Sequence, residues 1–370
     1  MPGVGLAVAT TSASFLSAAA FSSALAIPLS GIPVSILSGL ALKNTNVLPP
    51  SLMSSSAAPG LKLSTTTLLR AGIVCVGMKL SFLDLLTSGL VGIPVVVSAM
   101  SAGFLYIPWA SQKAGLSKEL GSLLATGTTV CGVTAITAAS PIVKASKADT
   151  AVAVANVVAF GTLGMLSFPY LAHHLFLTSP GCGTFLGVAI HDTSQVLGAG
   201  ASYAQIYDND AVLKIAAVTK LTRNLFLAGV VPGLAIQYAP SEKSGGEKDG
   251  TKAPPMNLAA SFVKYTPGFV LGFVGASLFR SAGDATLLHS GSAFGCLDGD
   301  AWKTVVSGVG TTASTALLGT AMAAVGLSTS KESLKGVGAK PFLVGGSGAL
   351  VVGGTGCAAI KTLEYAGIFV

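Results

Sequence analysis

Two hydrophobic segments carry polar residues of the kinds that bind ions and small solutes. The first, ATGTTVCGVTAITAASP at 125–141, places hydroxyls, glycines and a proline within a stretch long enough to cross a membrane. Backbone groups in hydrocarbon need partners from the protein, so a helix is interrupted only where protein or a water-filled cavity surrounds the break. We predict such an interruption, whose exposed N–H groups would attract anions; close packing through small residues is the alternative. The residues expected to face a substrate are Gly127, Thr128, Thr129, Cys131, Gly132 and Thr134.

The second segment, GVAIHDTSQVLGAGASYA at 187–204, has five consecutive polar residues near the middle of a hydrophobic stretch. Five in a row cannot share one helical face, so an interruption is expected here too. An ionisable residue inside a membrane is costly and typically marks an ion or proton pathway. The alternative is a polar loop over 177–195. The residues predicted to carry a coupling ion are His191, Asp192, Thr193, Ser194 and Gln195.

Two basic residues follow in AAVTKLTRNLFLAG, 216–229. Lys220 and Arg223 are three positions apart, so they share one face of a helix. They are expected to balance the charge of Asp192 or to contact an anionic substrate; extension of both side chains to a membrane interface is the alternative. Arg70 and Lys79 raise the same question more weakly.

The composition requires a membrane around these segments. The 370 residues are 51% hydrophobic and 9% charged, whereas globular domains carry about 25% charged residues. The chain is predicted to be an all-α polytopic membrane protein with ten or eleven transmembrane helices, since about 20 apolar residues span a bilayer. The predicted spans are 6–28, 30–42 (short), 64–86, 89–109, 118–143, 149–176, 183–205, 211–238, 258–281, 302–328 and 339–360.

The charged segments divide the chain. A hydrophilic linker is predicted at 238–257, between a first membrane part at 1–237 and a second at 258–370, and a long loop at 281–302. An excess of Lys and Arg marks the cytoplasmic side, which favours a cytoplasmic N-terminus. With eleven spans, that side holds Lys43, Lys62, Lys113, Lys118, Lys243, Lys248, Lys252, Lys331, Lys335 and Lys340, and the other side holds Lys144, Lys147, Arg280, Lys303 and Lys361.

A faint internal repeat relates two of these spans. LLRAGIVCVGMKLSFLDLLTSG at 68–89 aligns without gaps on LLGTAMAAVGLSTSKESLKGVG at 317–338. The two copies are an odd number of spans apart and would run in opposite directions. This arrangement is typical of inverted-repeat transporters; chance similarity between two Gly/Ala/Leu-rich helices is the alternative.

Several function classes lack support in the sequence. No phosphate-binding loop, dinucleotide fingerprint or metalloprotease motif is present. The five cysteines are far apart, so no zinc site is expected, and no nucleophile–base pair indicates an enzyme. The scattered basic residues do not favour nucleic acid. No cofactor is expected; the expected partners are a small anion, H⁺ or Na⁺, the lipid bilayer and, as an open option, a second copy in a homodimer.

At these segments the chain resembles the YeiH-type family of proposed sulfate exporters, the UPF0324 membrane proteins. The resemblance covers most of the chain and rests on LLRAGIVCVGMKLSFLDLL, LATGTTVCGVTAITAASPIVKA, VAVANVVAFGTLGMLSFPYL, GVAIHDTSQVLGAGASY, IAAVTKLTRNLFLAGVVP and LGTAMAAVGLSTSKESLKGVG. Where the family typically has Ile-His-Glu-Val-Ala-Gln, this chain has Ile-His-Asp-Thr-Ser-Gln at 190–195, so Asp192 keeps the carboxylate on a shorter side chain.

The resemblance implies a relation to the cation–proton antiporter and bile-acid sodium symporter superfamily, with inverted repeats and broken helices that cross at the midplane. The segments at 125–141 and 187–204 resemble its two crossing helices. They are two spans apart in our count, whereas an inverted pair needs an odd separation. Either one span is a re-entrant element or one assignment is wrong.

The expected function is secondary active transport of a small anion, of the sulfate or sulfonate type, by alternating access and coupled to H⁺ or Na⁺. Two other functions stay open: an ion-coupled organic-acid transporter of the same fold, and a non-transporting membrane scaffold or receptor. The scaffold predicts a dry interior in which Asp192 pairs with a basic residue.

Overall fold

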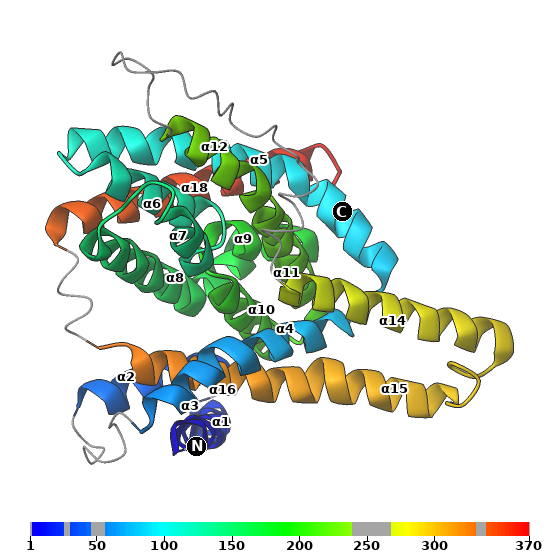
Figure 1. Ribbon diagram of the computed structural model, residues 1–370. Coiled ribbons are helices and arrows are strands. Elements are labelled where there is room, and N and C mark those ends of the chain that lie inside the picture. Colours follow the sequence, from blue (N-terminus) through cyan, green and yellow to red (C-terminus); the bar gives the residue numbers. More distant parts are fainter. Residues whose placement is uncertain (1, 26–29, 46–55, 239–267, 331–337, 370) are drawn as a thin grey trace, which may run out of the picture.

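The protein is a bundle of helices in which two bodies lie side by side (Figure 1). A computed structural model describes residues 2–25, 30–45, 56–238, 268–330 and 338–369. These residues form helices and turns without a strand, apart from an isolated bridge between Ala293 and Leu297. The all-α prediction is therefore confirmed for the described part of the chain.

The first body, which we call the hairpin body, contains both polar segments. Its elements are α5 (Phe82–Lys113), α6 (Lys118–Thr129), α7 (Val133–Ala139), α8 (Lys147–Leu175), α9 (Ser179–Ala189), α10 (Thr193–Tyr207), α11 (Asp210–Leu225), α12 (Leu227–Gln237) and α18 (Ala339–Tyr365). The second, the flanking body, comprises α1 (Pro2–Leu25), α2 (Gly31–Asn44), α3 (Ala58–Leu63), the π-helix η1 (Ser64–Leu68), α4 (Leu69–Gly77), α14 (Gly268–Ser290), α15 (Gly299–Ser307), the π-helix η2 (Gly308–Ala313) and α16 (Ser314–Ser328).

Five helices of the described residues are long and apolar enough to cross a membrane. They cover Pro2–Ala24, Leu85–Lys113, Lys147–Leu175, Gly299–Ser328 and Ala339–Tyr365. Most of the other predicted spans are short or interrupted, whereas α14, with 23 residues, is continuous. The 14 residues of α2 rise only about 21 Å, less than the hydrocarbon thickness. The predicted ten or eleven transmembrane helices are therefore not confirmed within the described residues.

Helix packing defines two faces of the bundle. Gly103 of α5 packs against Val352 of α18, and Gly348 packs against Ile107, so the two helices are antiparallel. We call face 1 the face that holds the end of α5 and the start of α18, and face 2 the opposite one. The amide of Asn156, near the start of α8, donates to the carbonyl of Pro341 at 2.7 Å, so α8 also starts at face 1.

The predicted span 118–143 turns back instead of crossing. Helix α6 starts at face 1, and Thr129 at its end reaches the depth of Gly103 in α5. The next long helix, α8, starts again at face 1. Ile136 of α7 packs back against Gly127 of α6. The segment is therefore a re-entrant hairpin, hairpin 1, formed by α6 and α7 and open at face 1.

The predicted span 183–205 also turns back, from the other face. Helices α9 and α10 are separated by residues 190–192. The amide of Asn209, just after α10, donates to the Ser179 hydroxyl at the start of α9 at 2.9 Å. Both ends therefore lie together at face 2, and we call this segment hairpin 2. The two hairpins open at opposite faces, as an inverted pair requires. Re-entrant elements therefore explain why the two segments were counted as two spans apart.

The two candidate repeat segments pack as antiparallel neighbours in the flanking body. Gly72 of α4 lies against Leu317 and Leu318 of α16. Further along, Lys79 lies against Gly310. The opposite directions of the two segments agree with an inverted repeat. The repeat itself stays a prediction. Residues 331–337 of its second copy lie outside the described residues.

The predicted long loop at 281–302 is mostly helical. Helix α14 continues to Ser290, and Asp298 caps α15 by accepting from the Ala301 N–H at 2.7 Å. The two helices form an arm that projects beyond the rest of the molecule (Figure 1). The sequence prediction overlooked the packing between these two helices, in which the Trp302 ring lies directly on Gly283.

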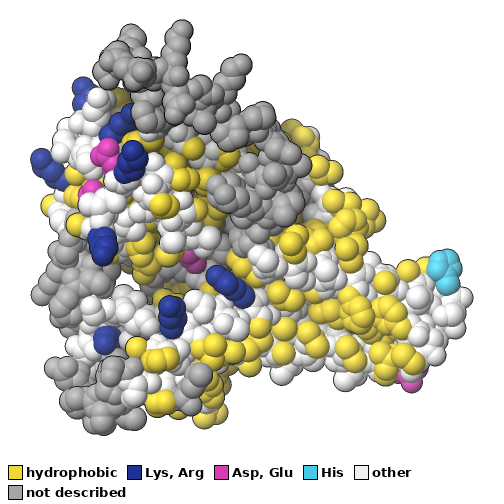
Figure 2. Space-filling model, in the orientation of Figure 1, with side chains coloured by type: hydrophobic (Ala, Val, Ile, Leu, Met, Phe, Trp, Pro, Cys, Tyr) yellow, Lys and Arg dark blue, Asp and Glu magenta, His cyan; other side chains and the backbone are white. Residues whose placement is uncertain are grey.

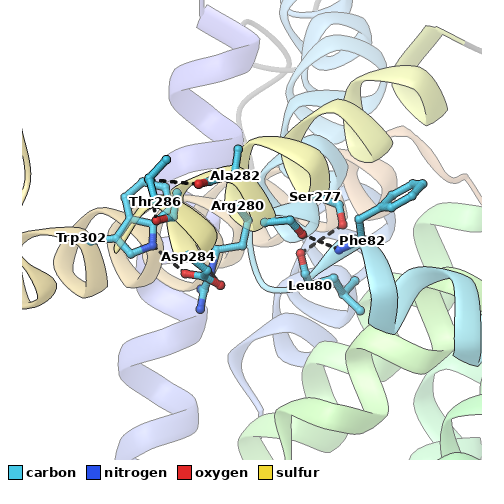
Figure 3. A network of polar contacts seen from close by, with 10 residues as sticks. Leu80, Phe82, Ser277, Arg280, Ala282, Asp284, Thr286 and Trp302 are labelled. Carbon is cyan, nitrogen blue, oxygen red and sulfur yellow. Dashed lines mark hydrogen bonds and ion pairs between the residues drawn. The ribbon is translucent and has the colours of Figure 1, made fainter. Parts of the chain in front are cut away.

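Polar contacts join this arm to the start of α5 (Figure 3). Ser277 donates to the Leu80 carbonyl at 3.0 Å, and the Phe82 N–H donates to Ser281 at 2.7 Å. Asp284 accepts from the Arg280 guanidinium and from the Trp302 indole, both at 2.7 Å. The start of α14 follows residues 239–267, which are outside the described residues, as is nearly all of the predicted linker.

The re-entrant path of hairpin 1 corrects the predicted distribution of charge. Lys144 and Lys147, predicted opposite Lys113 and Lys118, lie on the same face as those residues because the chain returns to face 1. Lys43 and Lys62 lie there too, since Asn44 bonds the Thr329 carbonyl at 3.1 Å and Leu61 packs with Leu327. The excess of lysine on face 1 favours a cytoplasmic position for this face, and the orientation stays a prediction. Lys243, Lys248, Lys252, Lys331 and Lys335 are outside the described residues.

Candidate functional site

The tips of the two hairpins meet inside the hairpin body. Gly132, at the tip of hairpin 1, has φ +71°, and a Cβ built on it would lie 2.8 Å from Oδ2 of Asp192 at the tip of hairpin 2. A side chain at 132 would therefore strain the backbone and collide with the other tip. The two polar segments, about 60 residues apart in the sequence, form one site.

Arg223 binds the C-terminal ends of α6 and α9, the helices that lead to the two hairpin tips. It is fully buried, so it does not extend to an interface. Its Nε donates to the Thr129 carbonyl and one terminal nitrogen to the Thr128 carbonyl, both at 2.8 Å, and that nitrogen also reaches Thr129. The other terminal nitrogen donates to Gly187, at 3.3 Å, and to Val188. A guanidinium has five N–H donors, and all five are used on backbone carbonyls.

Lys220 completes the same arrangement one turn earlier on α11. Its ammonium is fully buried and donates to the carbonyls of Val130 and Ile190, each at 3.1 Å, and to that of His191. These three bonds use its three donors. The C-terminal end of a helix has free carbonyls and a partial negative charge. At the ends of α6 and α9, the two cations donate hydrogen bonds to these carbonyls and offset the negative charge. Neither forms an ion pair with Asp192 within the described residues, so their part in balancing its charge stays a prediction.

Asp192 is the half-buried carboxylate of the site. Its Oδ1 accepts from the Ser194 N–H at 2.9 Å and from the Ser194 hydroxyl at 2.5 Å. It therefore caps the N-terminus of α10, where the helix dipole favours a negative charge. Its Oδ2 faces Gly132.

The predicted substrate-facing residues divide into buried and exposed ones. Thr128 and Thr129 are buried and give their carbonyls to Arg223. The Thr129 hydroxyl bonds back to the Ala125 carbonyl at 2.7 Å. Cys131 is buried between the tips, whereas Thr134 is exposed. Of the six, Thr134 is therefore the one with an exposed side chain.

The remaining residues of the second segment lie in a polar layer around the tips. Gln195 donates to the Val158 carbonyl at 3.2 Å and to the Thr162 hydroxyl at 3.0 Å. Thr193 lies 3.4 Å from the Asn224 amide, which donates to it. His191 is buried beside them.

Four buried side-chain atoms of this layer have no hydrogen-bond partner among the described residues. They are His191 Nδ1, Gln195 Oε1, Thr219 Oγ1 and Asn224 Oδ1. Thr219 and Asn224 were not among the predicted site residues, although both are polar neighbours of Lys220 or Arg223 on α11. Unpartnered buried polar atoms are costly, so their concentration here distinguishes the site from ordinary packing. No group of His, Cys, Asp and Glu suited to a metal occurs among the described residues.

Comparison with known proteins identifies the family. A family model described as "Conserved hypothetical protein 698" matches residues 2–345. The UPF0324 inner membrane protein YeiH of Escherichia coli (strain K12) is 30% identical over 319 residues, covering 85% of this chain and 80% of the relative. The UPF0324 membrane protein RSc1111 of Ralstonia nicotianae is 29% identical over 324 residues, covering 86% and 81%. No solved structure matches.

A relative in Nitratidesulfovibrio vulgaris, named UPF0324 membrane protein, is 31% identical over 253 residues, covering 68% of this chain and 66% of the relative. The names of these relatives and the five long apolar helices agree that this is an integral membrane protein. The family match extends from the first helix through both hairpins and the arm. The chain therefore belongs to the UPF0324 family of membrane proteins.

Proposed function

We propose that this protein is a secondary active transporter of a small anion, which it moves by alternating access with coupling to H⁺ or Na⁺. The observation that carries the proposal is the meeting of two re-entrant hairpins, open at opposite faces, at a polar site in the middle of the bundle. Discontinuous helices that meet near the bilayer midplane are how secondary transporters build substrate and ion sites.

The charge of the site supports an anion. Lys220 and Arg223 are buried cations, and Asp192 is the carboxylate beside them. An excess positive charge in a medium of low dielectric attracts an anion over several ångströms. Because the donors of both cations are used on carbonyls, the anion's hydrogen bonds have to come from elsewhere, and the exposed hydroxyl of Thr134 is available.

Asp192 is the proposed position of the coupling ion. Its carboxylate adjoins the substrate region and would repel an anion while ionised. A proton or Na⁺ on Asp192 removes this repulsion, which makes anion binding depend on the coupling ion. Substrates of the sulfate or sulfonate type are the proposed class.

Figure 2 shows the molecule hollowed between the hairpin body and the flanking body, with basic side chains and an acidic one around the hollow.

The dry scaffold, in which Asp192 pairs with a basic residue, is less well supported, because Asp192 forms no ion pair within the described residues. An organic-acid carrier differs in substrate alone, and competition by sulfate, sulfonates and carboxylates separates the two.

Flux into proteoliposomes tests the proposal. Asp192→Asn keeps the size of the side chain and removes its titration, so we expect anion flux driven by a pH or Na⁺ gradient to fall at least tenfold. Asp300→Asn is the control, because that side chain is 98% exposed on the arm. Undiminished, gradient-driven flux in folded Asp192→Asn protein would exclude Asp192 from coupling. Absence of flux for every anion tested with the unmodified protein would contradict transport.

A further inference from the structure

A cavity of about 560 Å³ opens near face 1, away from the hairpin tips. It lies between the end of α5, the first turns of α6 and the end of α12. Its polar lining includes Ser111, Gln112, Ser117 and Lys118, and its apolar lining includes Trp109 and Leu234. The cavity therefore combines a basic, hydroxyl-rich region with an apolar wall.

An apolar groove of about 420 Å³ continues from this cavity into the bundle. The cavity and the groove share Phe104, and the groove follows α5 to Val97 on one side and α12 from Val230 to Phe226 on the other. By helix rise, Phe104 lies about 13 Å and Val97 about 24 Å from Lys113 at the end of α5. Together, the two hollows reach from the membrane interface into the depth of the hydrocarbon.

The side chains around the groove indicate that it faces lipid. Leu105 is 77% exposed and Val97 41% exposed beside it. Trp109, in the lining of the larger cavity, is 55% exposed, as is typical of tryptophan at a membrane interface. A molecule bound in the groove therefore contacts α5 and α12 through apolar groups.

The wider end is built for a polar, negatively charged group. The hydroxyl of Ser111 lines it, is buried, and has no hydrogen-bond partner within the described part of the chain. Lys118 lies at the N-terminus of α6, where the helix dipole adds positive charge, and its ammonium also packs 4.8 Å from the Tyr238 ring centroid. Glu119 is the acidic neighbour, but Lys113 and the other lysines of face 1 leave the surroundings positive.

We propose that the two joined hollows bind one anionic phospholipid. The headgroup phosphate lies beside Lys118 and Ser111, and one acyl chain follows the groove between α5 and α12. A free anion would leave the apolar groove without an occupant, and an apolar molecule would leave the Ser111 hydroxyl without a hydrogen-bond partner. Basic pockets between helices on the cytoplasmic side are suited to anionic headgroups. This proposal does not depend on the protein being a transporter.

Native mass spectrometry of the full chain, released from nanodiscs, tests it. Retained phosphatidylglycerol and phosphatidylcholine with identical acyl chains are compared. Lys118→Gln should lower the retained phosphatidylglycerol about fivefold, the effect of one lysine beside an anionic headgroup, and leave phosphatidylcholine unchanged. Ser101→Trp, which fills the groove, should lower the retention of both lipids.

Two controls match these variants. Lys147→Gln removes a lysine from face 1 outside the cavity lining, and Leu163→Trp enlarges a lipid-exposed residue of α8; both should retain the wild-type level of lipid. Inorganic phosphate should not displace the lipid. Equal retention in all variants, or no preference for phosphatidylglycerol, would overturn the proposal. So would displacement by phosphate combined with no effect of Ser101→Trp, which would instead indicate a site for a soluble anion.

Discussion

At the scale of single residues, Arg223 and Lys220 stabilise the site through the backbone. Their eight hydrogen bonds all end on carbonyls near the hairpin tips. A buried charge is costly unless its donors are satisfied, and the free carbonyls at the ends of α6 and α9 are equally in need of donors. We therefore interpret both residues as positioning residues that hold the tips together, rather than as substrate ligands.

Arg223→Lys tests this interpretation. Lysine has three donors instead of five, so some carbonyls lose their partner, and we expect a loss of about 2–4 kcal/mol in unfolding free energy. Thermal unfolding in detergent measures it. The same substitution at Arg280, which bonds Asp284 alone, is the matched control and should cost less than about 1 kcal/mol. Unchanged stability of Arg223→Lys with loss of anion flux would instead indicate that Arg223 contacts the substrate.

At the same scale, Gly132→Ala tests the contact between the tips. Alanine at φ +71° is strained, and its Cβ would collide with Asp192. Gly115 has φ +73° and open space around it, so Gly115→Ala measures the strain alone, about 1–2 kcal/mol. We expect Gly132→Ala to cost about 1–3 kcal/mol more in thermal unfolding. Equal costs at the two positions would mean that the tips do not touch.

At the scale of elements, the hairpins explain how polar residues reach the middle of the bundle. An interrupted helix that turns back delivers its tip to half the depth of the membrane and leaves both ends at one face. The interruption is tolerated because α11 supplies cations to the freed carbonyls of both hairpins. Three elements that separately could not remain in hydrocarbon are thus stable together.

Cross-linking distinguishes hairpin 2 from a straight span. The Ser179 hydroxyl and the Asn209 amide are 2.9 Å apart, whereas a continuous helix over the same residues would separate them by about 45 Å. Ser179→Cys/Asn209→Cys should therefore form a disulfide on mild oxidation, detected as a linked peptide by mass spectrometry. Ser179→Cys/Lys147→Cys should not cross-link. A missing link in the first pair would contradict the re-entrant path.

At the scale of the whole molecule, few polar contacts join the two bodies at face 2. The ammonium of Lys79, 7% exposed, lies 2.9 Å from a carboxylate oxygen of Asp210, 54% exposed. The Ser30 hydroxyl donates to Gln205 at 2.8 Å. Under the proposed alternating access, these contacts would keep face 2 closed.

Asp210→Asn tests this closure. A partly exposed ion pair contributes at most about 1 kcal/mol, so its loss should raise the population open at face 2 about fivefold. Buried Cys131 at the tip serves as the reporter, with the other cysteines replaced by alanine and an impermeant thiol reagent added from face 2. The labelling rate should rise accordingly, Asp300→Asn should leave it unchanged, and Lys79→Asp/Asp210→Lys should restore it. An unaltered rate in Asp210→Asn would show that the pair does not close this face.

The sequence by itself determined the class of the protein and the positions of both interruptions. Hydrophobic length and the placement of Gly, Pro and polar residues are local properties, so they identify a membrane protein and an interruption within each of the segments 125–141 and 187–204 without reference to the rest of the chain. They also singled out Lys220 and Arg223 as unusual.

Only the tertiary structure decided where the chain goes after each break and what the two cations do. Whether a broken helix crosses or returns depends on which distant groups satisfy its free carbonyls, and Arg223 is 94 residues from Thr129. Asn224 and Thr219 escaped prediction for the same reason, because their role depends on neighbours from other helices. Local composition does not predict which distant residues will be neighbours, because the packing of α11 between the two hairpins brings these residues together.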